Sequence, residues 1–315
     1  MKAVYIMSSP RGGSTLLSLV LGRHSHMVNL GEVSFIPKLL SLDELCTCQE
    51  KLHSCPSWAQ VFANIAQDTQ VDMSTQPYAL HLDDVMKHKS GTGKIDHNHQ
   101  RKWRMIRSKI RGGLDMLMLK YQPSTGKFIS LPSISQGVEN TIRLYKAAAT
   151  AWNKDVVIDA SKLPRKAIHL YKKSPDEVRI IHLTRDSRGV SASHKAHIQI
   201  DRAAERWSYY HTLSMRLIDK WVKPEHVRRL KYEDFVNQPD VHLRELCDWL
   251  EVPYSEQALD FATTVESHSA GGNPTRFKFS DGIRPVDERW RTVLSEGEVK
   301  VIETICGKVS RKLGY

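Results

Sequence analysis

The sequence predicts an α/β fold with a central parallel sheet, helices on both faces and additional helical insertions. Three segments support this prediction, because each joins a short β-branched apolar run to a following helix: residues 3–22, 156–171 and 178–198. No internal repeat and no Pro-, Gly- or Ser-rich linker divides the 315 residues. We therefore expect a single domain over 1–315, with an insertion at about 45–130.

The first of these segments encloses a turn that is suited to binding anions. Residues 3–7 are the apolar strand, and residues 8–13 form a turn with one proline and two glycines. Ser14 and Thr15 then begin a leucine-rich helix, whose free N–H groups and dipole attract negative charge. An arginine in such a turn can hold a phosphate through two parallel N–H bonds. The candidate ligands are Arg11, Gly12, Gly13, Ser14 and Thr15.

This turn is P-loop-like without matching the usual nucleotide-binding motif. The motif G-x-x-x-x-G-K-[ST] requires a lysine directly before the Ser or Thr, whereas Gly13 stands before Ser14 here. A P-loop kinase or NTPase is therefore a weaker alternative, and a clear magnesium-binding carboxylate strand is also missing.

A second short strand is expected over residues 27–30, followed directly by Gly31 and Glu32. Enzymes with parallel sheets bind ligands at the edge where such strands end. From the residues alone, Glu32 is either an exposed carboxylate that caps a helix over 33–40 or a general base.

The next feature is a cysteine-rich segment with Cys46, Cys48, His53 and Cys55. Thiolates and imidazoles are zinc ligands, but the spacing departs from the usual paired arrangement and no second half-site follows. A structural role without metal, a zinc site and a disulfide from Cys46 or Cys48 to Cys55 all remain open.

A basic run over residues 97–111, with Trp103 embedded in it, precedes a helix predicted to extend to Tyr121. Such charge runs are usually solvated faces. This run would also suit a lid over an anionic ligand, or a non-enzymatic module that binds acidic glycans or other polyanions.

Two further strands end in polar residues. Residues 156–159 are followed by a turn that holds Lys162, and residues 178–184 are followed by Arg185. The carboxyl ends of parallel strands share one edge, so we expect both cations beside the first turn. The rest of the chain is predicted to form helices over 137–152, 201–221, 241–250 and 299–313, a strand and turn over 227–235, and a loop over 271–278.

The first turn resembles a known family. Ser9-Pro-Arg-Gly-Gly-Ser-Thr-Leu-Leu17 is similar to the 5′-phosphosulfate loop of sulfotransferases that use 3′-phosphoadenosine-5′-phosphosulfate (PAPS), in the branch with Arg. That branch includes bacterial enzymes and the Golgi glycan and protein-tyrosine sulfotransferases. Arg185, with Ser193 eight residues later, resembles the 3′-phosphate motif of the family. Together the two motifs are much more specific than either one alone.

The resemblance implies transfer of a sulfonate from PAPS to an acceptor hydroxyl on a glycan, a tyrosyl side chain or a small molecule, with no metal required. It implies that Glu32 is the base, and that Arg11 and Lys162 stabilise charge on the sulfonate and the leaving phosphate. Tyr232 is expected near the adenine, and Arg276 in a loop that closes over the 3′-phosphate. If Glu32 is not the base, the alternatives are His24, His26, His194 and His197.

Composition limits the partners. The formal net charge is +11, from 46 Lys and Arg against 35 Asp and Glu, which favours an anionic partner without choosing among nucleotide, acidic glycan, nucleic acid and membrane surface. We expect a hydroxyl-bearing, anionic acceptor and no nucleic acid. No run approaches the roughly 18 apolar residues of a membrane span. The short apolar run at the N-terminus and the five cysteines favour a cytoplasmic protein with no membrane span.

Overall fold

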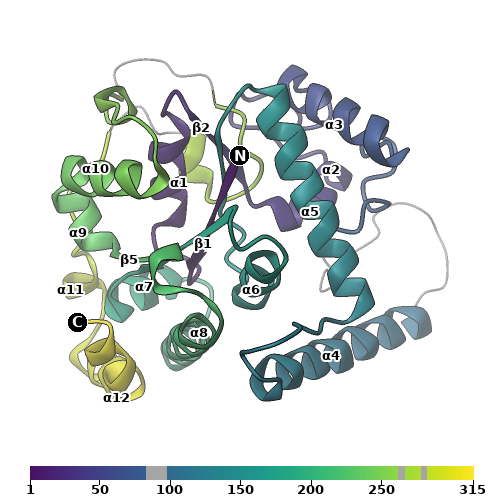
Figure 1. Cartoon of the computed structure of the whole chain (residues 1–315). Helices are drawn as coiled ribbons and strands as arrows, with labels where there is room; N and C mark the ends of the chain where they lie inside the picture. The colour runs from purple at the N-terminus through teal and green to yellow at the C-terminus, as the bar shows by residue number, and fades with distance from the viewer. Residues whose placement is uncertain (83–97, 262–266, 278–281) are drawn as a thin grey trace.

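The computed structural model describes residues 1–82, 98–261, 267–277 and 282–315, with side chains from residue 109 onward in the helix that begins at Asn98. Its centre is a sheet of five parallel strands (Figure 1). The strand order is β2-β3-β1-β4-β5. The bounds are β1 (Lys2–Ser8), β2 (Met27–Gly31), β3 (Val156–Asp159), β4 (Val178–Thr184) and β5 (Val227–Lys231). The predicted α/β fold is confirmed.

Helices cover both faces of this sheet (Figure 1), as the alternating side chains of β1 require. Ala3, Tyr5 and Met7 point into one buried cluster, while Val4 and Ile6 point into the other. The first cluster is covered by α5 (Pro132–Ala151), α6 (Pro164–Lys173) and α8 (Ile200–Trp221), and the second by α1 (Ser14–Gly22), α9 (Tyr232–Asn237) and α10 (Pro239–Leu250).

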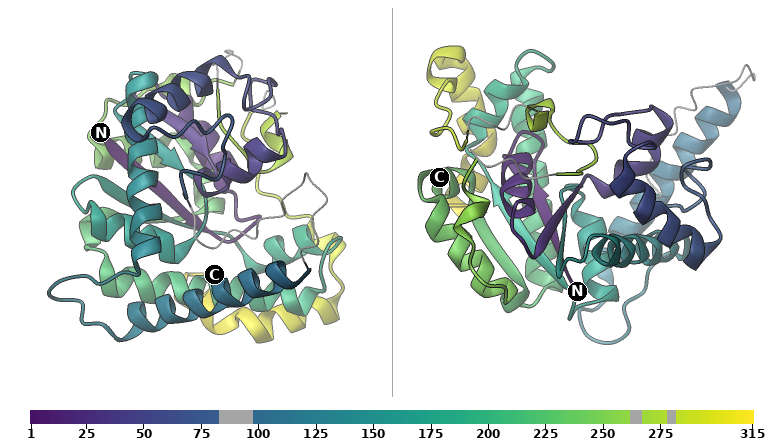
Figure 2. Two further views of the ribbon diagram at one scale, coloured as in Figure 1. Left: turned by 90° about the vertical axis from the view of Figure 1, so that its right-hand side faces the viewer. Right: turned by 90° about the horizontal axis from the view of Figure 1, so that it is seen from above.

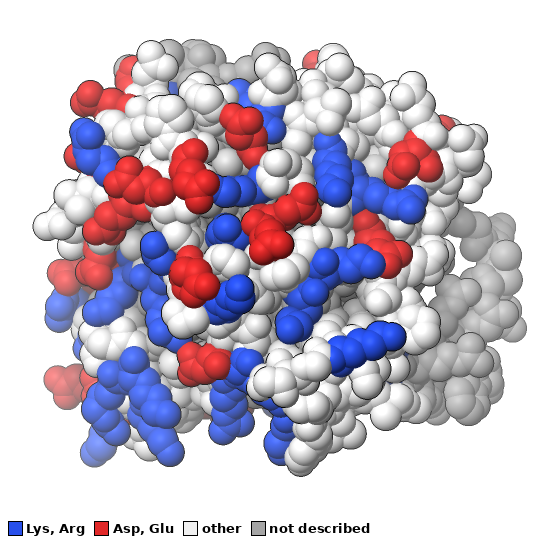
Figure 3. Space-filling view, viewed as in Figure 1, with Lys and Arg blue, Asp and Glu red and all other residues white. Residues whose placement is uncertain are grey.

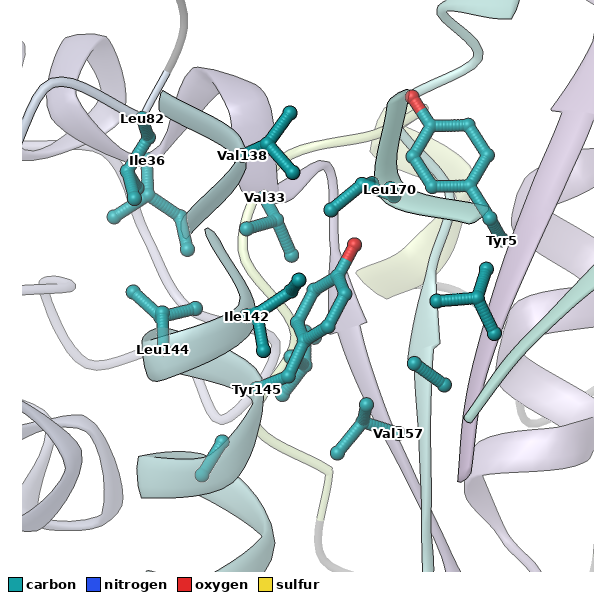
Figure 4. Packing of buried hydrophobic residues seen from close by; sticks show 14 of the residues in the cluster. Tyr5, Val33, Ile36, Leu82, Val138, Ile142, Leu144, Tyr145, Val157 and Leu170 are labelled. Atoms are coloured by element: carbon teal, nitrogen blue, oxygen red, sulfur yellow. The ribbon is translucent and has the colours of Figure 1, made fainter. Parts of the chain in front are cut away.

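The first cluster also packs the inserted segments onto the sheet (Figure 4). Tyr145 and Ile142 of α5 lie between Val157 of β3 and Val33, which follows β2. The Tyr145 hydroxyl donates to Asp159 Oδ2 at 2.5 Å, and both side chains are buried. Burial raises the pKa of both groups.

Further helices surround this core (Figure 2). The inserted helix α4 (Asn98–Tyr121) runs beside α8, where Trp221 Nε1 donates to the Leu119 carbonyl at 3.2 Å. The other helices are η1 (Val33–Phe35), α2 (Ile36–Ser41), α3 (Pro56–Thr69), α7 (Ser187–His194), η2 (Pro224–His226), η3 (Glu256–Ala258), η4 (Pro274–Phe277), α11 (Trp290–Val293) and α12 (Glu296–Lys312).

Several local predictions differ from the structure or fall outside it, among them the helix expected over 137–152, which begins at Pro132. The helix expected over 188–198 ends at His194, and the helix expected over 33–40 begins with a 3₁₀ turn. The side chains of the basic run from residue 97 to residue 108 lie outside the described residues. The single-domain division with its insertion stays a prediction.

In the part of the chain that the structure describes, no helix is both long and apolar enough to cross a membrane. The charged side chains are of both signs on the face that Figure 3 shows, with Lys and Arg gathered towards its lower edge. This face is therefore not uniformly basic.

Candidate functional site

The candidate site lies at the edge of the sheet where all five strands end. The loop 9–13 follows β1, and Glu32, Lys162, Arg185 and Tyr232 follow β2, β3, β4 and β5 respectively. Because the strands are parallel, these positions share one edge. The chain also changes direction here, since β1 lies between β3 and β4, which is where parallel sheets open a crevice.

The loop after β1 leaves the start of α1 open. Gly13 is the N-cap residue, with φ of 92°, and no side chain caps the helix. A Cβ on Gly13 would lie 2.2 Å from Tyr232 Cδ2, so glycine is required by both backbone and space. The buried Ser9 hydroxyl, at the same turn, has no hydrogen-bond partner among the described residues. Uncapped N–H groups and an unpartnered hydroxyl fit an anion here.

Glu32 and Lys162 form an ion pair beside this loop. Lys162 Nζ donates to Glu32 Oε1 and, at 3.0 Å, to the Ala160 carbonyl. Their side chains are 21% and 15% exposed, so both can still be reached from solvent. Lys162 has φ of 63°, and the Tyr210 hydroxyl donates to its carbonyl at 3.0 Å. The main chain at Lys162 is therefore held in an unusual conformation.

Glu32 is positioned by a close backbone approach. Gly31 has φ of 77°, and a Cβ there would lie 2.0 Å from the Ala270 carbonyl oxygen. That oxygen accepts the Glu32 N–H at 2.8 Å, and the Ala270 N–H donates to Leu30 at 3.1 Å. The segment around Ala270 thus continues the sheet edge beside β2.

A buried polar network joins the turns after β2 and β3. The Ser161 N–H donates to Asp159 Oδ1 at 2.7 Å, and the Ser34 N–H donates to Ser161 Oγ at 3.0 Å. Lys166 Nζ donates to Ser34 Oγ at 2.8 Å. These bonds fix the relative position of the segments that carry Glu32 and Lys162.

Arg185 is tied to the first loop. Its Nη1 donates to the Arg11 carbonyl at 3.1 Å, and its guanidinium carbon lies 4.6 Å from the centre of the Tyr232 ring. Asp287, which the sequence did not suggest, lies 3.4 Å from Arg185 Nη2. Ser193 is half-buried in the last turn of α7, on the helix that follows Arg185.

Arg276 bonds to its own loop and to the segment at Leu45. It is 8% exposed, and it donates to the carbonyls of Gly272 at 2.9 Å and Leu45 at 3.3 Å. Burial lowers its pKa, while the nearby Glu44 and Glu32 raise it. The Asn273 N–H approaches Thr15 Oγ1 at 3.4 Å, which places this loop over the start of α1. Contact between Arg276 and a 3′-phosphate stays a prediction.

The structure separates the four alternative histidines. His24 and His26 precede β2, at the opposite edge of the sheet, where they contact Pro253 and Asp155. His194 lies on the same side as the first loop: burial and then the charge of Arg11 lower its pKa. His197 is exposed beyond the end of α7.

The fold and the site define an α/β protein with a phosphate-type loop and a carboxylate–lysine pair at one sheet edge. A sequence profile of the Sulfotransferase family matches residues 3–256, so the chain belongs to the sulfotransferase family. This match disfavours the kinase and polyanion-module alternatives. No curated protein sequence matches the chain.

Solved bacterial sulfotransferase structures are similar to this chain. The sulfotransferase domain from the Synechococcus PCC 7002 olefin synthase is 17% identical, with 97% of this chain and 94% of that chain covered and a TM-score of 0.52. The sulfotransferase domain from the curacin biosynthetic pathway is 16% identical, with 98% and 97% covered and a TM-score of 0.49. STF9 from Mycobacterium avium is 12% identical, with 99% and 76% covered and a TM-score of 0.47. At 17% identity, the similarity to the olefin synthase domain shows a shared fold.

Proposed function

We propose that this protein transfers a sulfonate from PAPS to the hydroxyl of an acceptor. The observation that carries the proposal is the Glu32–Lys162 ion pair, which lies at the same sheet edge as the uncapped start of α1. A base and a cation beside an anion cradle are the groups that such a transfer needs. Membership in the sulfotransferase family supports the same reaction class.

The donor would occupy the loop after β1 and the turn after β4. The 5′-phosphate and the sulfonate fit Arg11, the backbone at Gly12 and Gly13, and the hydroxyls of Ser14 and Thr15. The 3′-phosphate fits Arg185 and Ser193. Tyr232, whose ring lies against Gly13 and Arg185, offers a flat surface at the nucleotide end of the site.

In the proposed reaction the acceptor oxygen forms a bond to sulfur while the bond from sulfur to the bridging oxygen of the donor breaks. Glu32 takes the acceptor proton, and the electron pair of the broken bond stays on the leaving phosphate of 3′-phosphoadenosine-5′-phosphate. Lys162 and Arg11 stabilise the charge on that phosphate and on the sulfonate. Binding would exchange the Glu32–Lys162 contact for contacts with the reactants.

For the acceptor, we propose a chemical class and no particular compound. The positive net charge favours an anionic ligand of any kind. Membership in the sulfotransferase family supports a hydroxyl-bearing acceptor over nucleic acid. The side chains of Cys46, Cys48, Cys55, Cys247 and Cys306 are all unpaired by disulfides, which is compatible with the predicted cytoplasmic location.

The proposed base is tested by Glu32→Gln in a transfer assay that measures 3′-phosphoadenosine-5′-phosphate released from PAPS across a panel of hydroxyl acceptors. We expect turnover to fall about 10²–10⁴-fold, because the amide cannot take the proton, with donor affinity changed by less than about twofold. Glu205→Gln, an exposed position on α8, is the control and should retain full turnover. Undiminished turnover in Glu32→Gln would contradict the assignment and favour His194.

A further inference from the structure

Four metal-ligating side chains meet on the far side of the Ala270 segment from the sheet. They are Cys46, Cys48, Cys55 and His268, and their ligating atoms all lie within 4.8 Å of one another. Cys46 and Cys55 are buried, and the other two are half-buried. His268 is 213 residues from Cys55, so no spacing in the sequence could have revealed the fourth member.

Three of the six distances between these atoms are close to the edges of a coordination tetrahedron. With Zn–S bonds of about 2.3 Å and a Zn–N bond of about 2.0 Å, tetrahedral geometry requires S···S edges of about 3.8 Å and S···N edges of about 3.5 Å. Cys48 Sγ and Cys55 Sγ are 3.7 Å apart. His268 Nδ1 lies 3.3 Å from Cys55 Sγ and 3.9 Å from Cys46 Sγ. A disulfide would need about 2.05 Å between two sulfur atoms.

The first two cysteines are held by a tight turn. Gln49, with φ of 73°, donates its N–H to the Cys46 carbonyl at 2.9 Å, and the Cys46 N–H donates to Glu50 at 2.8 Å. Cys55 is the N-cap residue of α3, where the helix dipole favours a thiolate. Burial raises the pKa of the Cys46 and Cys55 thiols, and the backbone N–H groups of Cys48 and Trp58, which approach the two sulfur atoms, oppose this shift.

His268 is positioned by hydrogen bonds between residues 267–269 and the cysteine-bearing part of the chain. Trp58 Nε1 donates to the His268 carbonyl at 2.6 Å. Thr47, between the two cysteines, donates its hydroxyl to the Ser267 carbonyl at 2.5 Å and accepts the Ser269 N–H at 2.9 Å. Both neighbours of His268 are thus bonded to the residue between Cys46 and Cys48, so the ligand set is preorganised.

We propose that Cys46, Cys48, Cys55 and His268 bind one structural zinc ion. Three sulfur ligands and one imidazole nitrogen form a closed tetrahedral set, with no position left for water or substrate. The site would therefore support the fold and take no part in the transfer chemistry.

The zinc would fix the loop that lies over the candidate active site. Two residues beyond His268, the Ala270 main chain bonds to Leu30 and Glu32. Further along, the Asn273 N–H reaches Thr15, and Arg276 bonds to the carbonyl of Leu45, next to Cys46. The ion would join the two segments on which these contacts depend. The proposal rests on the ligand geometry alone and does not require PAPS to be the donor.

Metal analysis of the full chain is the direct test. The protein would be expressed in medium that contains zinc and dialysed against a weak chelator before the measurement. We expect about one zinc per chain. Substitution by Co²⁺ should give the strong sulfur-to-metal charge-transfer absorption of a tetrahedral thiolate site, which a surface-bound ion would not show.

Two histidine variants sharpen the test. His268→Gln should lower the zinc content well below that of the unaltered chain, because it removes a ligand. His53→Gln should leave it unchanged, since His53 is exposed and pairs with Asp43 although it lies between Cys48 and Cys55 in sequence. Equal zinc loss in both variants would contradict the assignment of His268.

Two outcomes in the unaltered chain would overturn the proposal without reference to any variant. One is a folded, monodisperse protein that contains no zinc after expression with zinc and shows no Co²⁺–thiolate absorption. The other is an intact mass two hydrogens lower, with peptide mapping that places a disulfide between Cys48 and Cys55. Either result would leave the donor-binding proposal untouched, so the two failures are distinguishable.

Discussion

Arg185 lies where three parts of the candidate site meet: the Arg11 carbonyl, the Tyr232 ring and the Asp287 carboxylate. It is 9% exposed, and a guanidinium so placed needs acceptors on several sides. Arg289 and Arg185 contribute to lowering the pKa of Asp287 to about 2, and the hydrogen bond from Arg289 is the largest cause. Asp287 is thus an anion beside Arg185. A bound phosphate would compete with this carboxylate for the guanidinium of Arg185.

At this residue we expect Arg185→Ala to weaken binding of 3′-phosphoadenosine-5′-phosphate by about 10- to 150-fold, because charge-assisted hydrogen bonds of about 1.5–3 kcal/mol are lost. Titration calorimetry measures the change. Arg179→Ala is the matched control, since Arg179 lies at the other end of β4 and bonds to the carbonyls of Pro175 and Asp176. Equal affinity in both variants would remove Arg185 from the donor site.

The loop between β1 and α1 is the element that most constrains the site. Its conformation depends on Gly13, which has a positive φ and against which the side chain of Tyr232, at the start of α9, packs directly. The sequence identified this loop because its glycines, proline and helix start are adjacent along the chain. It could not identify the packing of Tyr232 on Gly13, because that contact joins residues far apart in sequence.

For this element we expect Gly13→Ala to abolish measurable donor binding and to lower the free energy of unfolding by about 1–3 kcal/mol, because the methyl group would displace Tyr232 or the loop. Gly113→Ala is the control: Gly113 lies inside α4, and a Cβ there meets nothing within 4 Å. That change should stabilise the chain by up to about 1 kcal/mol. Urea unfolding and calorimetry report both quantities, and a Gly13→Ala variant with normal donor affinity would contradict this view of the loop.

At the scale of the whole molecule, the sequence predicted the parallel sheet and the strand ends but not the contacts between distant turns. β3 and β4 have the predicted bounds, since short β-branched runs between polar turns define a buried strand. The pairing of Asp287 with Arg185 and the joining of His268 to the cysteines depend on how the chain returns to the site. Local sequence patterns do not predict contacts between segments that are so far apart in the chain.

Two buried histidines link the stability of the fold to pH. His182 of β4 and His211 of α8 face each other, with 3.0 Å between Nε2 and Nδ1. Burial, and secondarily the charge of Arg229, lower the pKa of His182 to about 3, and burial holds the pKa of His211 well below its usual range. The unfolded chain takes up protons below about pH 6.5 that the folded chain does not. The free energy of unfolding should therefore fall as the pH drops below about 6.5.

Each histidine contributes a slope of up to about 1.4 kcal/mol per pH unit in that acidic range and none above it. We expect His211→Gln to flatten the decline between pH 6.5 and 5 by up to this amount, as measured by urea unfolding at several pH values. His53→Gln, at an exposed position, should leave the decline unchanged. The same acid dependence in His211→Gln as in the unaltered chain would exclude the buried pair as its source.

The central claim is that the sheet edge holds PAPS, and direct binding of its desulfated product tests this claim without knowledge of the acceptor. We would titrate the purified full chain with 3′-phosphoadenosine-5′-phosphate in a calorimeter, with ATP and Mg²⁺ as the comparison. The proposed site predicts saturable binding of the bisphosphate at one site per chain and much weaker binding of ATP, which lacks a 3′-phosphate for Arg185. Absence of bisphosphate binding by folded protein, or a preference for ATP, would contradict the account.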